Sequence, residues 1–195
     1  MGGPQHPVVR VSTHEFLIGD PRDAFLSSFG CRPDTSLLES ELQKNLMSTA
    51  LRIDLPRRVL GGFGRSVNAS CRHVAPCSQE DLARVLDSAS REGLTIGFRG
   101  SGKSYGDASL NSRGVIVDTT RMNKMISWDP IAGILEGEPG LTIEGVWRRT
   151  LEDGYWPAVV PGTMFPTLAG CTSMNIHGKN NFKVGSFGEQ IVDLD

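Results

Sequence analysis

Gly97-Phe-Arg-Gly-Ser-Gly-Lys-Ser-Tyr-Gly-Asp107 decides the fold, because two kinds of phosphate-binding loop share this composition. Its first eight residues fit the P-loop pattern G-x-x-x-x-G-K-[ST]. A P-loop must open a helix, whose first amide groups help to hold the phosphates. After Ser104, however, the chain has Gly106, Asn111 and Gly114, which are poor helix formers, and then the strand-like run 115–118. The sequence therefore predicts a strand, loop, strand unit.

A glycine-rich loop between two strands can still bind a pyrophosphate. Successive backbone amides form a concave anion site, and small residues let the ligand come close. We therefore expect a dinucleotide pyrophosphate loop. A P-loop for ATP or GTP at Gly97–Ser104 and an ordinary glycine turn stay open as alternatives.

Composition limits the classes of protein that need to be considered. The chain has 195 residues and a formal net charge of −2, which is typical of a soluble globular protein and not of a nucleic-acid binder. It has no apolar run of eighteen residues and no signal-peptide pattern, so the expected location is cytoplasmic, with no transmembrane segment. Cys71, His73 and Cys77 lie close in sequence but lack a fourth ligand, so no metal site is predicted.

The chain divides into two parts by composition. Residues 1–58 are rich in Pro, Ser and charge, and we expect a partly ordered N-terminal extension. Its one predicted element is a helix capped by Ser36 and Glu39, with Leu38, Leu42 and Leu46 on one face. Residues 59–195 form the second expected domain.

The second part alternates between strand and helix patterns. Helices are predicted after the caps Ser78 and Thr142, ending at Gly93 and Gly154. The second helix should turn Ile143, Val146, Trp147 and Leu151 inward. Strands are predicted at 72–75, 94–98 and 115–118, in a hairpin at 125–128 and 133–136, and from 191 onward. The fold class is therefore α+β, with a mixed sheet and flanking helices.

A second group of small residues lies in the final third of the chain. It comprises Val160-Pro-Gly-Thr163, Leu168-Ala-Gly170 and Asn175-Ile-His-Gly-Lys-Asn180. Glycine, alanine and threonine beside a few apolar side chains suit the close approach of a flat, largely apolar ligand with polar edges. For His177 alone, a structural histidine held by hydrogen bonds is an equally good interpretation.

Together, the blocks 99–107, 161–163 and 176–180 resemble the FAD-binding (PCMH-type) domain of the vanillyl-alcohol oxidase and p-cresol methylhydroxylase superfamily. Within it, the likeness is greatest to the decaprenylphosphoryl-ribose oxidases. The resemblance runs from about Leu60 to Asp195. It implies that the first block wraps the FAD pyrophosphate with backbone amides, while the later blocks line the flavin.

The resemblance also implies site residues. Those expected to bind the cofactor are Arg99, Gly100, Ser101, Gly102, Lys103, Ser104, Tyr105, Gly106, Pro161, Gly162, Thr163, Thr167, Gly170, Met174, Ile176, His177 and Gly178. His177 and Lys179 are the expected catalytic residues, with Asn180 near the substrate. Relatives with covalently bound flavin have His where this chain has Lys103, and a protonated ammonium is no nucleophile, so we expect dissociable FAD.

The implied activity is an FAD-dependent oxidoreductase that takes hydride from a CH–OH group of a sugar-like or polyol substrate, with an unidentified electron acceptor. A sterol-reductase type of reaction, a P-loop nucleotide-binding protein and a non-catalytic flavin-binding fragment are the alternatives. Members of this superfamily are more than twice as long. The resemblance therefore implies that this chain is an N-terminal fragment of the FAD fold, without the substrate-binding cap domain.

Overall fold

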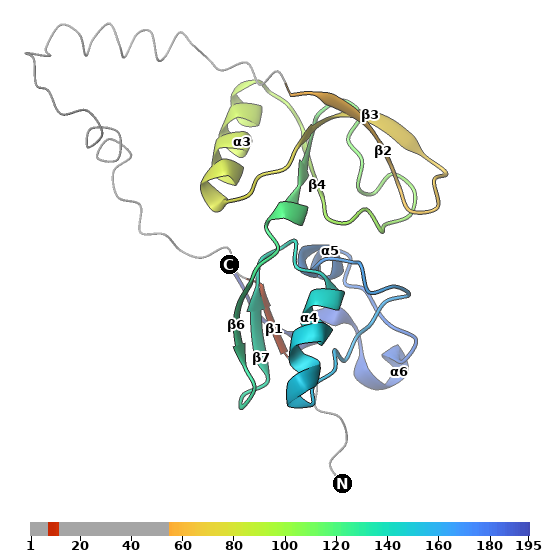
Figure 1. Cartoon of the computed structure of the whole chain (residues 1–195). Helices are drawn as coiled ribbons and strands as arrows, with labels where there is room; N and C mark the ends of the chain where they lie inside the picture. The colour runs from red at the N-terminus through yellow and green to blue at the C-terminus, as the bar shows by residue number, and fades with distance from the viewer. Residues whose placement is uncertain (1–7, 12–54) are drawn as a thin grey trace, which may run out of the picture. The chain divides into compact units, whose positions relative to one another are not determined.

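The computed structural model describes residues 8–11 and 55–195, which belong to one compact unit (Figure 1). The helix predicted from Ser36 to Leu46 lies outside the described residues. Within them, the strands form two four-stranded sheets.

The first sheet has the strand order β2-β3-β5-β4. β2 pairs antiparallel with β3, whereas β3 and β4 both pair parallel with β5. The short run Val-Ile-Val of β5 is fully buried in the middle of the sheet, as expected for a central strand. The bounds are Arg57–Gly61 for β2, Asn68–Val74 for β3, Ile96–Arg99 for β4 and Val115–Asp118 for β5.

Helix α3 (Gln79–Arg91) covers this sheet, and its capping follows the prediction. The Ser78 side chain accepts a hydrogen bond from the Asp81 amide at 3.1 Å, and Gly93 ends the helical segment with φ +63°. Ala89 of α3 packs with Val115 and Val117 in a small buried cluster. Leu82 and Val85 of the same helix are partly buried against this cluster, so α3 turns these residues toward the sheet.

The second sheet has the order β6-β7-β1-β8. β6 and β7 form the predicted antiparallel hairpin, whereas β1 pairs parallel with β7 on one side and with β8 on the other. The bounds are Met125–Asp129 for β6, Ile134–Gly137 for β7, Val8–Val11 for β1 and Ile191–Leu194 for β8. The central strand β1 was not predicted, since the sequence indicated only a helix in the first 58 residues.

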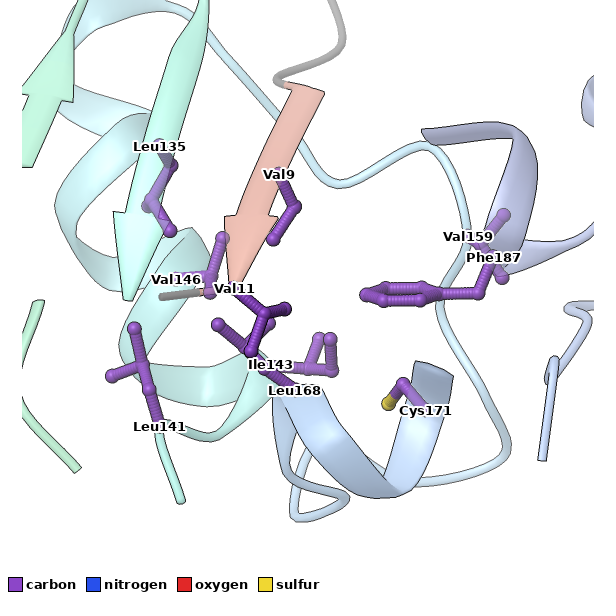
Figure 2. Close-up of a cluster of buried hydrophobic side chains, with 10 residues drawn as sticks. All are labelled: Val9, Val11, Leu135, Leu141, Ile143, Val146, Val159, Leu168, Cys171 and Phe187. Atoms are coloured by element: carbon purple, nitrogen blue, oxygen red, sulfur yellow. The ribbon is translucent and has the colours of Figure 1, made fainter. Parts of the chain in front are cut away.

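Helices pack on the second sheet and enclose the larger core (Figure 2). They are α4 (Ile143–Thr150), α5 (Leu168–Ser173), α6 (Asn181–Val184) and the short 3-10 turns Leu151–Asp153 and Phe187–Gln190. A further 3-10 turn, Thr119–Arg121, follows β5 and contacts β4 of the first sheet. Thr142 caps α4 as predicted, with its hydroxyl accepting from the Gly145 amide at 3.1 Å. Leu151 is 50 % exposed, so its predicted inward position is wrong: α4 ends at Thr150, and Leu151 belongs to the following turn.

The predicted α+β class with mixed sheets is confirmed. The strand, loop, strand unit around residues 100–114 is also confirmed, because β4 runs through the loop into β5 with no helix between them. The two sheets have separate hydrophobic cores, with no residue in common among the described ones.

Candidate cofactor site

A cavity of about 430 Å³ lies where the glycine-rich loop meets α5 and the segments before it. The first wall comes from α3, the end of β4 and the loop that follows. The second comes from the turn after β7, from α5 and from the segments on either side of α5. The lining residues are Leu82, Phe98, Arg99, Gly100, Ser101, Gly102, Lys103, Ser104, Ala108, Ser109, Thr119, Pro139, Pro161, Pro166, Thr167, Ala169, Gly170, Ser173, Met174 and Ile176.

The backbone amides of Gly100–Ser104 are available to a ligand. Among the described residues, none of these five N–H groups donates a hydrogen bond to another backbone or side-chain atom. A backbone N–H group without a hydrogen-bond acceptor costs free energy when it is removed from water. Successive N–H groups in a loop can form a concave site that binds an anion. The loop therefore has the chemistry that a pyrophosphate needs.

Two glycines allow the close approach that shapes this loop. A Cβ on Gly100 would overlap the Thr167 hydroxyl oxygen on the opposite wall. Gly102 has φ +67°, and a Cβ there would overlap the guanidinium of Arg99. Any larger side chain at either position would push the walls of the cavity apart or fill the loop.

Arg99, at the end of β4, anchors the start of the loop through hydrogen bonds to two other segments. Its Nη1 donates to the hydroxyl and the carbonyl of Ser109 at 2.8 and 3.3 Å, and its Nη2 donates to the Gly61 carbonyl at 2.9 Å. All three acceptors are uncharged, and within residues 8–11 and 55–195 Arg99 forms no salt bridge. Among the described residues, no carboxylate therefore compensates its positive charge, which lies beside the unpaired amides of the loop.

Lys103 is held by aromatic rings. Its ammonium nitrogen lies 5.5 Å from the centre of the Phe63 ring and 5.2 Å from the centre of the Phe165 ring. Both distances are within the range of a cation–π interaction. Phe63 belongs to the turn after β2, whereas Phe165 precedes α5, so Lys103 links segments of both sheets.

The second wall is built on α5. Thr167 caps this helix, accepting from the Gly170 amide at 3.3 Å. Ala169, Gly170 and Ser173 face the cavity, whereas Leu168 and Cys171 of the same helix are fully buried in the core. Burial raises the pKa of the Cys171 thiol to about 12, so this thiol stays neutral.

The cavity brings together most of the residues expected to bind the cofactor. Those on its surface are Arg99, Gly100, Ser101, Gly102, Lys103, Ser104, Pro161, Thr167, Gly170, Met174 and Ile176. The others lie outside the lining: Tyr105, Gly106, Gly162, Thr163, His177 and Gly178. Lys179, expected to be catalytic, also lies outside it.

The residues outside the lining have different surroundings. Tyr105 is 74 % exposed and packs edge-on against Phe63, with ring centres 5.4 Å apart. Gly178 is packed against Val160, because a Cβ there would lie 2.8 Å from the Val160 carbonyl oxygen. His177 follows the lining residue Ile176, but its side chain is exposed, with Nδ1 3.4 Å from the Gly178 carbonyl.

Several lining residues were missed by sequence reasoning. Leu82 and Phe98 read as core positions of α3 and β4, and Pro139 and Pro166 read as loop prolines. The hydroxyl residues Ser109 and Thr119 lie beyond the glycine motif and carry no pattern of their own. Only the position of Phe98, inside the Gly97–Asp107 stretch, was a usable signal.

Beside the cavity, Asp118 at the end of β5 ties β3 to the turn that contains Thr119. Its carboxylate accepts from His73 Nε2 at 3.0 Å and from the Thr120 amide and hydroxyl at 3.0 and 2.6 Å. Burial acts to raise the pKa of Asp118, but these hydrogen bonds outweigh it and hold that pKa below its usual value. In the described part of the chain, no three His, Cys, Asp or Glu side chains are grouped so as to hold a metal ion.

Comparison with known proteins identifies the family. A family model described as FAD binding domain matches residues 72–195, which is more than half of the chain. The chain belongs to this FAD binding domain family. The resemblance inferred from the sequence is thereby confirmed, and FAD is the cofactor of this domain.

Curated relatives agree with this assignment. Decaprenylphosphoryl-beta-D-ribose oxidase of Mycolicibacterium smegmatis is 30% identical over 137 residues, covering 70% of this chain and 30% of the relative. An uncharacterized FAD-linked oxidoreductase of Mycobacterium tuberculosis is 27% identical over 120 residues, covering 61% of this chain and 26% of that protein. The FAD binding domain described here thus spans less than a third of the length of these relatives.

Solved structures share the fold. Alkyldihydroxyacetonephosphate synthase superposes with a TM-score of 0.58 at 19% identity, over 84% of this chain and 33% of that one. Cholesterol oxidase from Brevibacterium sterolicum superposes with a TM-score of 0.55 at 17% identity, over 65% and 26% of the two chains. None of the described helices is long and apolar enough to span a membrane.

Proposed function

We propose that the FAD binding domain holds FAD in the cavity between the glycine-rich loop and α5, as part of an FAD-dependent oxidoreductase. The observation that carries this proposal is the run of five unpaired amides at Gly100–Ser104 on the cavity wall. In this arrangement the loop receives the pyrophosphate, with the charge of Arg99 beside it. The flavin lies along Pro161, Ala169 and Gly170, where small side chains admit a flat ring.

The substrate that we propose is a sugar-like or polyol alcohol. When bound, FAD would accept the hydride that leaves the carbon bearing the hydroxyl, giving a carbonyl product. His177 is our candidate for receiving the hydroxyl proton, since its exposed ring follows a lining residue. Lys179 and Asn180 follow in an exposed segment and are candidates for contacting the hydroxyl groups of the substrate. We keep the cytoplasm as the proposed location.

We further propose that the flavin is not covalently attached. Lys103 occupies the position at which relatives with covalent flavin have His, and its ammonium is engaged by the Phe63 and Phe165 rings. A protonated, ring-bound amine does not attack the flavin. Acid precipitation of the FAD-loaded protein should leave the flavin in the supernatant, and flavin in the pellet would contradict this.

A nucleotide-hydrolysing P-loop is the second candidate, because Gly97–Ser104 matches that motif. Two observations weigh against it. The loop runs into β5 without the helix that a P-loop opens, and Lys103 is directed at aromatic rings. A third candidate, a flavin-binding domain without turnover of its own, predicts FAD binding but no loss of flavin colour when alcohols are added anaerobically.

The first test is thermal unfolding with FAD and, separately, with magnesium ATP. A ligand that prefers the native state raises the midpoint, by the equivalent of about 2.7 kcal/mol at a hundred times its Kd. We expect FAD to raise Tm and magnesium ATP to leave it unchanged. A rise with ATP alone would reject the flavin proposal.

The variant Lys103→Ala distinguishes the FAD proposal from the P-loop alternative for the same loop. In a P-loop this lysine contacts the phosphates, so its removal would abolish binding. In the flavin site the backbone amides make the contact, so we expect the Kd for FAD to change less than about twofold, within the ~0.5 kcal/mol typical of a substitution that removes no direct contact. Isothermal titration of both proteins gives the Kd, and Lys183→Ala, an exposed lysine outside the cavity, is the matched control.

A further inference from the structure

The central strand of the second sheet comes from outside the residues that match the family. β1 (Val8–Val11) lies between β7 and β8, whereas the family match begins at residue 72. Residues 72–195 alone would therefore leave two strands with unpaired edges facing one another. Unpaired strand edges are templates for another strand.

The contacts of β1 define what this gap accepts. Val9 and Val11 are 4 % and 7 % exposed and enter the core, in the middle of the cluster in Figure 2. Leu135 pairs with Val9 on the β7 side, and Ile191 pairs with it on the β8 side. The gap thus binds an extended backbone, parallel to both neighbours, with small β-branched side chains at every second position.

Arg10 of β1 forms a salt bridge with Asp193 of β8 that is too long to be a hydrogen bond. Its Nε lies 3.7 Å from an Asp193 carboxylate oxygen, and this buried nitrogen has no hydrogen-bond partner among the described residues. Because the salt bridge is long and partly exposed, it contributes little binding energy. The two valines therefore carry most of the affinity, and the Arg10–Asp193 pair favours one register.

β1 is joined to the rest of its compact unit only through a long stretch of chain. In the sequence, residues 12–54 separate it from Leu55, where the next described part of the chain begins. The strand is thus held in the sheet by its non-covalent contacts, and an identical strand from another chain would make the same contacts.

We propose that the gap between β7 and β8 is an acceptor site for an extended Val-x-Val strand. Val8–Val11 is its ligand, and the same strand of a second copy of this chain can fill it. Reciprocal exchange gives a closed symmetric dimer in which each copy completes the sheet of the other. This is β-strand addition, with specificity set by the two inward valines.

A peptide-binding experiment tests the acceptor site. The probe is a fluorescent peptide of residues 6–13, His-Pro-Val-Val-Arg-Val-Ser-Thr, added without FAD to the full chain carrying Val9→Asp and Val11→Asp. We expect saturable binding to this variant and weak binding to the unaltered chain, whose site is filled. A control peptide with the same two Asp changes should bind at least about tenfold more weakly, because a charged side chain cannot replace a valine buried in the core without a large desolvation cost. A folded variant that does not bind the peptide would overturn the proposal.

A second measurement serves if the variant does not fold. The unaltered full chain receives a protease site after Gly30 and is cut after folding. We expect the N-terminal piece to stay with the rest in gel filtration and to be displaced by excess peptide. Its loss on cutting alone, with the remainder still folded by circular dichroism, would show that β1 is not a bound ligand.

Exchange between copies is tested with two affinity tags. Unaltered chains bearing different tags are unfolded, mixed and refolded at increasing concentration. We expect a mixed dimer that co-purifies on both tags and does not form when both chains carry Val9→Asp and Val11→Asp. Peptide binding without any mixed dimer would overturn the second-copy part of the proposal.

Discussion

At the scale of single residues, Gly100 controls the distance between the two walls of the cavity. It has no side chain because the Thr167 hydroxyl occupies the space where a Cβ would lie. Thr167 is itself fixed, since it is buried and caps α5. The glycine-rich loop and α5 therefore meet at a contact that tolerates no added atom.

We predict that Gly100→Ala destabilises the protein by about 1–3 kcal/mol, the usual cost of overpacking. It should also weaken FAD binding, because the added methyl displaces the amides on one wall or the helix cap on the other. Chemical denaturation and FAD titration measure the two effects. Gly162→Ala is the matched control for stability, since a Cβ there meets nothing within 4 Å. Equal stability of the two variants would contradict this account.

The sequence indicated this loop well because its signal is local. Glycines at 100, 102 and 106 are unusual for a strand connection, and small residues beside an anion site have a direct physical reason. Ser109 and Thr119 could not be found in this way, because they reach the cavity only through the pairing of β4 with β5. The position of the Arg99 guanidinium beside the loop likewise could not be predicted, because it depends on a hydrogen bond to the Gly61 carbonyl, 38 residues earlier in the chain.

At the scale of elements, α5 is a wall shared by the core and the cavity. Leu168 is fully buried among Val9, Val11 and Phe187, and the neighbouring Thr167 and Ala169 line the cavity. A substitution on the core side of this short helix should therefore shift the residues on its cavity side, against which we propose that the flavin lies.

We predict that Leu168→Ala lowers the free energy of unfolding by about 2–5 kcal/mol, as for other buried leucines. It should also weaken FAD binding, because the cap of α5 shifts into the space that is left. Val159→Ala is the control: Val159 is buried in the same cluster but does not line the cavity. Its stability should fall while its Kd for FAD stays within about twofold, ~0.5 kcal/mol, of the unaltered value. Equal FAD affinities of the two variants at a temperature where both are folded would reject the shared wall.

Element prediction succeeded where one segment carries its own signal. The caps Ser78 and Thr142 and the inward positions Ile143 and Val146 of α4 follow from patterns within a single segment. β1 could not be predicted in this way, because four residues of the pattern Val-Val-Arg-Val become a strand only between two partners more than 120 residues further along the chain. Long-range pairing of this kind leaves no local trace in the sequence.

At the scale of the whole molecule, the cavity proposed for FAD is lined by residues that pack against both hydrophobic cores, Leu82 against one and Ile176 against the other. One core lies between the first sheet and α3, the other between the second sheet and its helices. The cavity is lined from both, by the loop after β4 and by α5. A cofactor bound in this cavity would therefore link two parts that share no core residue within the described part of the chain.

We predict that FAD makes thermal unfolding more cooperative as well as raising Tm. Without FAD, the two cores should unfold in overlapping steps, with a calorimetric enthalpy larger than the van't Hoff enthalpy. At a hundred times Kd, the added ~2.7 kcal/mol should raise Tm by roughly 5–10 °C for a domain of this size, and the two enthalpies should become equal. Differential scanning calorimetry measures both, with Gly100→Ala as the control in which the link is weakened. If FAD moved only one of two steps, the cofactor would contact a single core, and the proposed position across both cavity walls would be wrong.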